Sequence, residues 1–232
     1  MTFALLDIFT SPHWDTRKLT IEEIEDSGSM NLIRTETVTD ARTAAIVACS
    51  DGDSRLERRI RDELDRNNVY KSWRAAMPSR APEAIAKYQK KYKHCDLSAA
   101  NNDVLTHGDV LSMGQRLFHG GFWRAGQSPC VTTRLFSTSL SPYVAFQNAL
   151  EGGKAHAAGR LDLMVLRVVT PKAKAYVFRP RGSKLGHEYE VLLSSGLCFT
   201  LQSDICVRSD FSAGSTSGSK EIPVHVLEID VS

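Results

Sequence analysis

The spacing of hydrophobic residues changes near the middle of this chain. In the first half, apolar residues recur at helical intervals: Leu56, Ile60 and Leu64 are four residues apart and form one stripe on a highly charged segment. After Gln115 the apolar residues come in short runs rich in β-branched and aromatic side chains, as in β-strands. Helices followed by a mostly antiparallel set of strands predict an α+β domain.

Four helices are expected, over residues 41–49, over 54–66, after Pro82, and over about 97–113. Asp40 is a suitable N-cap for the first of them, and Asn67-Asn68 ends the second. Gly108 leaves the end of the fourth helix open. The forty residues before these helices have weak periodicity and predict an irregular lead-in.

Seven strands are expected, over residues 115–119, 134–139, 163–170, 174–178, 188–194, 198–202 and 224–231. Pro142 is expected to begin a short helix between the second and third strands, because proline is favoured in the first helical turn. The Ser- and Gly-rich residues 212–220 predict a mobile loop between the last two strands. The chain thus divides into a lead-in (1–40), a helical region packed on the core (41–113) and a β core (114–232).

The composition is that of a soluble globular protein, with 42% hydrophobic and 24% charged residues. The net charge of +2 is too small to indicate a nucleic-acid-binding protein. Charge is uneven, however: residues 1–40 hold eight acidic and three basic side chains, whereas residues 51–93 hold twelve basic and seven acidic ones. The basic stretch predicts a solvated helical face, with a docking surface for an acidic partner as the alternative.

The five cysteines are odd in number and form no Cys-x-x-Cys pair, which favours a reducing compartment over a disulfide framework. Because histidines and cysteines do not occur at zinc-ligand spacing, we expect no metal site. The segment from Met1 to Thr10 is short and lacks a basic n-region, so it is a poor secretory signal. No run is long enough to span a bilayer, and we expect no membrane insertion.

Three short segments carry candidate chemistry. The first is Leu117-Phe118-His119-Gly120-Gly121, in which an apolar strand presents His119 at its tip and two glycines allow a ligand to approach the backbone. A plain turn after the strand is the alternative interpretation.

The second segment is Phe136-Ser137-Thr138-Ser139, followed by the helix that Pro142 begins. Alternation along a strand directs Ser137 and Ser139 to one face and Thr138 to the other. Two hydroxyls on one face can bind a polar ligand or a neighbouring carboxylate. Alternatively, these residues simply suit a strand edge and cap the helix.

The third segment is Gly186-His187-Glu188-Tyr189-Glu190-Val191-Leu192-Leu193. Period-two geometry places Glu188 and Glu190 side by side on one face. Neighbouring carboxylates repel, so a purely structural strand gains nothing from the pair; two exposed glutamates on an edge strand are the alternative. A metal site is a weaker alternative, because no partner ligands occur at helical spacing.

Together and in this order, the His-Gly, Phe-x-Ser-Thr-Ser and Glu-x-Glu-Val-Leu-Leu segments resemble the ADP-ribosyltransferase toxin and effector family, over roughly residues 110–232. The resemblance implies an ADP-ribosyltransferase-like split β core with an N-terminal helical region, and NAD as the substrate. It also implies that Glu190 is the catalytic glutamate. Its carboxylate would bind the nicotinamide-ribose hydroxyl and stabilise the oxocarbenium-like transition state as nicotinamide leaves.

The same resemblance implies roles for the other residues of the three segments. Ser137 would hold Glu190 in position, and Glu188 would engage the nucleophile of the acceptor. Ser139 would support the same pocket, and Gly120 would offer backbone groups to the nicotinamide amide. The implied NAD-binding residues are His119, Gly120, Ser137, Thr138 and Ser139.

One position departs from the family pattern. Glu-x-Glu members usually carry arginine where this chain has His119, and a histidine there is typical of the poly-ADP-ribose polymerase and diphtheria-toxin branch. Arginine provides a permanent charge and a fork of donors that suits phosphates, whereas histidine is mostly neutral at pH 7. Arg116, Arg124 and Arg134 are the nearby candidates to replace that charge.

These observations predict a mono-ADP-ribosyltransferase that modifies a target protein in a host or competitor cell, with arginine as the expected acceptor. A secreted bacterial effector or toxin is expected, similar to plant-pathogen type III effectors. The alternative is a catalytically altered or inactive module that binds a host protein or peptide, or whose cleft is blocked by residues 1–40. A third interpretation is an NAD glycohydrolase that uses Glu190 with water as the acceptor.

Overall fold

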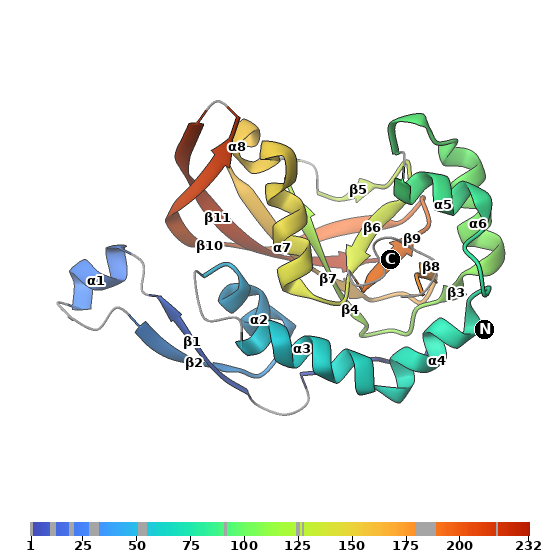
Figure 1. Ribbon diagram of the computed structural model, residues 1–232, viewed down its shortest axis with the longest axis horizontal. Coiled ribbons are helices and arrows are strands. Elements are labelled where there is room, and N and C mark those ends of the chain that lie inside the picture. Colours follow the sequence, from blue (N-terminus) through green and yellow to red (C-terminus); the bar gives the residue numbers. More distant parts are fainter. Residues whose placement is uncertain are drawn as a thin grey trace.

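The computed structural model describes residues 2–9, 13–18, 21–27, 33–50, 55–90, 92–123, 126, 128–179, 189–216 and 218–232. Its centre is a mixed nine-stranded sheet in the order β3-β8-β9-β6-β4-β7-β11-β10-β5 (Figure 1). These strands are β3 (Asp109–Val110), β4 (Arg116–Gly121), β5 (Cys130–Val131), β6 (Phe136–Ser139), β7 (Leu161–Val168), β8 (Lys174–Val177), β9 (Glu190–Leu193), β10 (Cys198–Ser215) and β11 (Gly218–Val231). β7 and β11 run parallel, and the other neighbouring pairs are antiparallel.

The sheet divides between β4 and β6. In the register of these two strands a single pair, Phe118 with Ser139, connects them. By contrast, β4 pairs with β7 over six residues and β6 pairs with β9 over four. Beyond the single pair the two halves of the sheet separate, and backbone groups at the junction need other partners. The predicted α+β class with a split β core is therefore confirmed.

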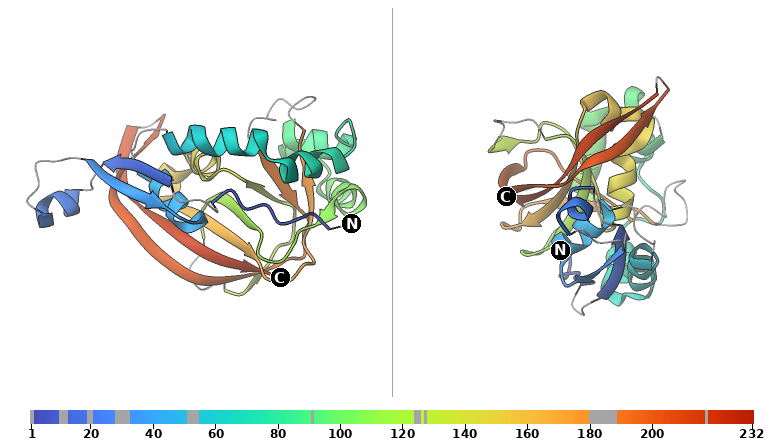
Figure 2. Two further views of the ribbon diagram at one scale, coloured as in Figure 1. Left: turned by 90° about the horizontal axis from the view of Figure 1, so that it is seen from below. Right: turned by 90° about the vertical axis from the view of Figure 1, so that its left-hand side faces the viewer.

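Helices cover the sheet and run along one side of it. They are α2 (Ala41–Ala48), α3 (Arg55–Arg66), α4 (Asn68–Ala76), α5 (Glu83–Lys90), α6 (Leu97–His107), α7 (Pro142–Leu150) and α8 (Lys154–Ala158), with the short 3-10 helices η1 (Tyr92–His94) and η2 (Glu151–Gly153). The left view of Figure 2 shows α3 and α4 in succession along one edge of the molecule. From residue 41 onward the helices α2 to α6 precede the strands of the nine-stranded sheet, and α7 and α8 lie between strands in the sequence.

The first two predicted helices form for the expected reasons. Asp40 caps α2, because its carboxylate accepts a hydrogen bond from the backbone N–H of Thr43 at 2.7 Å. On α3 the stripe of Leu56, Ile60 and Leu64 is buried in the core. An amphipathic helix gains most of its stability from burying such a stripe.

Two helix boundaries differ from the prediction. Asn67 ends α3 but also begins α4, since its side-chain oxygen accepts a hydrogen bond from the Val69 N–H at 2.8 Å. α6 ends at His107 rather than near residue 113. Gly108 follows it against β8, where an added Cβ atom would lie 2.6 Å from the Ala175 carbonyl oxygen.

The first forty residues contain regular structure that differs from the predicted irregular lead-in. β1 (His13–Lys18) pairs antiparallel with β2 (Ile33–Val38), and α1 (Ile21–Ser27) lies between them in the sequence. Figure 1 shows this ribbon projecting from the body, with α1 at its far end. Most residues of the two strands are polar, so hydrophobic periodicity could not indicate them.

The predicted mobile loop over residues 212–220 is wrong for the residues that the structure describes. β10 and β11 continue as one long hairpin, in which Ser212 pairs with Glu221 and Ser215 pairs with Gly218. The side chains of residues 218–221 are exposed. The serines and glycines of this segment therefore belong to the solvent-exposed end of a hairpin, which is stabilised by pairing of its backbone.

Candidate functional site

A cavity of about 300 Å³, here called the cleft, opens where the sheet divides. The candidate site residues that lie in the described part of the chain all line it: His119, Gly120, Ser137, Thr138, Ser139 and Glu190. Tyr88, Gln89 and Tyr92 of the α5–η1 segment face them, and Lys154 at the start of α8 lines the cleft as well. Segments far apart in the sequence thus share one cavity.

The centre of the cleft is a hydrogen bond between β6 and β9. The Ser137 hydroxyl donates to Oε1 of Glu190 at 2.7 Å, and the Glu190 side chain is 7% exposed. Ser139 pairs directly with Glu190 in the strand register, and Ser137 lies two residues further along β6 on the same face. Adjacent antiparallel strands therefore explain why this hydroxyl reaches this carboxylate.

Gln89 is a cleft residue that the sequence analysis did not predict. Its side-chain Nε2 donates to Oε2 of Glu190 at 3.1 Å. The two residues are 101 positions apart in the chain. No local signal marks Gln89, because it lies on α5 among residues whose pattern is that of an ordinary amphipathic helix.

The Glu188 half of the predicted acidic pair, with residues 180–188, falls outside the described residues. The predicted strand over 188–194 begins at Glu190, because Tyr189 has a φ of 51° in the left-handed region. The alternation along β9 is therefore described from Glu190 onward, and the placement of Glu188 beside it stays a prediction. The buried Tyr189 hydroxyl donates to the Asp65 carboxylate of α3 at 3.2 Å.

His119 bridges the two halves of the sheet. It lies within β4 rather than at the tip of the strand, and its Nδ1–H donates to the Ser137 carbonyl at 2.7 Å. A carbonyl can only accept, so Nδ1 carries the proton and Nε2 is an acceptor. Burial, with a smaller contribution from the nearby Lys154 charge, lowers the pKa of His119 to about 4. The ring is consequently neutral at pH 7.

Three of the predicted binding residues also have structural partners. An added Cβ atom on Gly120 would lie 1.7 Å from the Ala145 carbonyl oxygen, so the close approach at this glycine is that of α7. The Thr138 hydroxyl donates to the Val191 carbonyl at 2.6 Å, and the Ser139 hydroxyl accepts from the Ser141 N–H at 3.0 Å. A binding role for these three residues stays a prediction.

The candidates to replace the charge of arginine are placed differently from one another. Arg134 donates to the Tyr92 hydroxyl at 2.8 Å, beside the cleft. Arg116 lines a separate small cavity with Leu6, and Arg124 falls outside the described residues. Lys154, which no motif in the sequence marked, lines the cleft itself.

The described parts of the N-terminal segment do not enter the cleft. No residue of 2–9, 13–18, 21–27 or 33–40 is among those that line it. In the described chain, no helix is long and apolar enough to cross a membrane. Nor does that part of the chain gather three His, Cys, Asp or Glu side chains as a metal ion would require.

No protein-family model matches this sequence, and no curated protein matches it. Among solved structures, the chain is similar to the ADP-ribosyltransferase Vis from Vibrio splendidus in complex with agmatine: 13% identity, 78% of this chain and 87% of that chain covered, and a TM-score of 0.47. It is similar to Plx2a, an ADP-ribosyltransferase toxin from Paenibacillus larvae, with 10% identity, 74% and 96% covered, and a TM-score of 0.47. It is also similar to an ADP-ribosyltransferase from Clostridium botulinum, with 10% identity, 72% of this chain and 95% of that chain covered, and a TM-score of 0.43. The likeness is one of fold and assigns no role to any residue of the cleft.

Proposed function

We propose that this chain is a mono-ADP-ribosyltransferase that transfers ADP-ribose from NAD to a side chain of a target protein. The observation that carries the proposal is the 2.7 Å hydrogen bond from the Ser137 hydroxyl to the Glu190 carboxylate inside the cleft. A fixed and largely buried carboxylate that lines a cavity suits the stabilisation of positive charge on a sugar ring. The three motif segments, with their resemblance to the ADP-ribosyltransferase family, support the same activity.

In the proposed reaction the bond between nicotinamide and ribose breaks, and nicotinamide leaves with the bonding electron pair. The Glu190 carboxylate accepts a hydrogen bond from a ribose hydroxyl and offsets the positive charge that develops on the ring. A nitrogen of the acceptor side chain, expected to be arginine, forms the new bond to the same ribose carbon and loses a proton to a base. Glu188 is the residue that the family resemblance implies for this second task.

The cleft must also hold the phosphates of NAD, for which a neutral His119 is unsuited. Lys154 lines the cleft, and its charge lies near enough to His119 to contribute to the lowered pKa of the imidazole. We therefore propose that Lys154 supplies the positive charge for the phosphates. His119 instead fixes the Ser137 backbone, and with it the hydroxyl that holds Glu190.

The biological setting is a further part of the proposal. A secreted bacterial effector or toxin that acts on a protein of a host or competitor cell follows from the motif resemblance. The expected partner is a target protein, and arginine is the side chain expected to accept the ADP-ribose.

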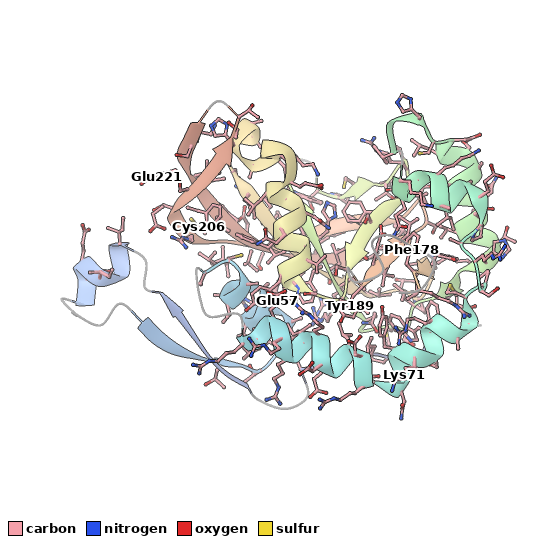
Figure 3. The ribbon with its side chains drawn as sticks, in the orientation of Figure 1. Glu57, Lys71, Phe178, Tyr189, Cys206 and Glu221 are labelled. Atoms are coloured by element: carbon pink, nitrogen blue, oxygen red, sulfur yellow. The ribbon has the colours of Figure 1, made fainter. Side chains whose placement is uncertain are left out.

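The first test is nicotinamide release from NAD by the purified chain and by Glu190→Gln. Loss of the charged oxygen is expected to reduce kcat by about 10²- to 10³-fold, because the carboxylate acts on charge present only in the transition state. Glu221→Gln is the matched control, since Glu221 is exposed on β11 and is not among the residues that line the cleft (Figure 3). Equal rates for wild type and Glu190→Gln would refute the assignment.

Label transfer separates the transferase from a hydrolase. With NAD labelled in the ADP-ribose part, the proposal expects label on protein, whereas a glycohydrolase releases free ADP-ribose only.

The neutral state of His119 favours one second candidate, a binding module that no longer binds NAD. A nucleotide that binds at a concentration a hundredfold above its dissociation constant raises the free energy of unfolding by roughly 2.7 kcal/mol. For the binding module, added NAD would give no such increase.

A further inference from the structure

We infer that Gln89 is a positioning residue that, together with Ser137, fixes the Glu190 carboxylate, and that helix α5 is thereby part of the active cleft. The inference deepens the proposed function and rests on it for the role of Glu190. The direct observation is that each carboxylate oxygen has its own donor. Ser137 Oγ donates to Oε1 at 2.7 Å, and Gln89 Nε2 donates to Oε2 at 3.1 Å.

Two donors from different elements restrain a carboxylate more than one does. Ser137 comes from β6 inside the sheet, and Gln89 comes from α5 on the other side of the cleft. With one bond, the carboxylate can still rotate about its last torsion, which is broad for glutamate. With both, the plane of the carboxylate is fixed. Hydrogen bonds to the charged form also lower the cost of burying it.

The chemistry of the partner decides the orientation of the Gln89 amide. An ionised carboxylate only accepts, so the NH₂ group of Gln89, rather than its carbonyl oxygen, must face Glu190. The substitution Gln89→Glu would replace this donor with a second carboxylate, which repels Glu190. Tyr88, whose pKa is raised by burial and by the Glu190 charge, stays protonated beside them and adds no second negative charge.

α5 is anchored firmly enough to present Gln89 in one place. Ile85 and Tyr88 are buried on its inner face. The Tyr88 ring meets the Tyr92 ring edge to face at 5.3 Å, and the Tyr92 hydroxyl accepts a hydrogen bond from Arg134 at 2.8 Å. Arg134 stands just before β6, so the α5–η1 segment is tied to the strand that carries Ser137. Such support is what a preorganised site requires.

The test is the pKa of the Glu190 carboxyl, measured by carbon-13 NMR of labelled glutamate in the protein without NAD. Glu190→Gln identifies the signal by its loss. Gln89→Leu, which is apolar and removes the donor, is expected to raise the pKa of Glu190 by about one pH unit. Gln89→Glu is expected to raise it further, because two adjacent carboxyl groups share a proton. The other titratable groups that line the cleft are unchanged in these variants: Tyr88, Tyr92, His119, Glu151 and Lys154.

Turnover provides the second readout. For Gln89→Leu we expect kcat for nicotinamide release to fall about tenfold while KM for NAD changes less than about threefold, and the acidic limb of the kcat–pH profile to move upward with the carboxyl pKa. Gln147→Leu is the matched control, since Gln147 is exposed on α7 and does not line the cleft. Gln89→Asn, which shortens the side chain by one methylene, replaces Gln89→Leu if that variant does not fold.

An unchanged Glu190 pKa in folded Gln89 variants would overturn the inference, because the hydrogen bond would then not exist in solution. So would a shift of equal size in Gln147→Leu. Failure of the proposed function is a separate outcome: the wild type would then release no nicotinamide, while the carboxyl titration would still decide whether Gln89 holds Glu190.

Discussion

His119 makes two contacts inside the fold, one with a backbone carbonyl and one with an aromatic ring. The Ser137 carbonyl lies where β4 and β6 cease to pair, and a buried carbonyl without a donor costs about 1–3 kcal/mol. The neutral His119 ring donates to it and packs against Phe136, with the ring centroids 4.2 Å apart. A guanidinium at this position would carry a permanent charge, which the burial that keeps His119 neutral disfavours. The neutral histidine therefore connects the two halves of the split sheet.

A pH dependence of stability follows from the neutral histidine. Its folded pKa of about 4 lies below the unfolded value near 6.5, so between these values the unfolded chain binds more protons. Stability contributed by His119 is fully present above pH 6.5 and is lost as pH falls toward 4, by at most about 3 kcal/mol.

Urea unfolding at pH 7.0, 5.5 and 4.5 measures this loss. His119→Asn places an amide donor near the position of Nδ1 but does not titrate. We expect the wild type to lose more stability than His119→Asn between pH 7.0 and 4.5. Parallel curves for the two proteins would show that His119 is not held neutral in the fold.

At the scale of elements, α7 packs tightly on β4, and both elements line the cleft. Gly120 is required for that contact, because the helix backbone at Ala145 occupies the place of its Cβ atom. Gly120→Ala is expected to push α7 away from β4 and to cost about 3 kcal/mol in the free energy of unfolding. The displaced helix would also widen the cleft, so NAD affinity is expected to fall.

Gly214→Ala is the control for this substitution. Gly214 also lies in a strand, β10, but no atom lies within 4 Å of the place that an added Cβ atom would take, and we expect a change within about 0.5 kcal/mol. Thermal or urea unfolding of both variants makes the comparison. Equal stabilities would mean that α7 does not sit tightly on β4.

Other elements show how much of the site could be predicted from local sequence patterns. The apolar stripe of α3 and the alternation along β6 predicted a helix and a strand, and the register with β9 then brought Ser137 to Glu190. Gln89 could not be found in this way, because its role depends on how α5 packs over the sheet. Lys154 was missed since the kink at Gly152 and Gly153, both with positive φ, resembles a flexible connection in sequence. Contacts between distant elements carry no local period.

At the scale of the whole molecule, the N-terminal residues join the helical region to the sheet. The Phe3 ring stacks on Trp73 of α4 with centroids 4.8 Å apart, and the Trp73 indole N–H donates to the Ala4 carbonyl at 2.9 Å. Three residues later, Leu6 exchanges two hydrogen bonds with the buried Gln115 side chain, which directly precedes β4. Residues 2–9 are therefore part of the core, and a role in blocking the cleft does not fit their position.

This arrangement predicts that the helical region and the β core unfold together. Phe3→Ala removes a ring that is 4% exposed and is expected to cost about 3 kcal/mol, whereas Leu5→Ala, at a side chain that is 49% exposed, is expected to cost well under 1 kcal/mol. Circular dichroism follows the helices and strands together. Tryptophan fluorescence, recorded with Trp14 and Trp123 replaced by phenylalanine in all the proteins compared, follows the environment of Trp73. A single unit requires that both signals shift to the same lower midpoint in Phe3→Ala. If fluorescence of Phe3→Ala shifted to a lower midpoint while circular dichroism kept part of its change at the wild-type midpoint, the helical region would be a separately folding part. Gln89 would then reach Glu190 from an element able to detach from the cleft.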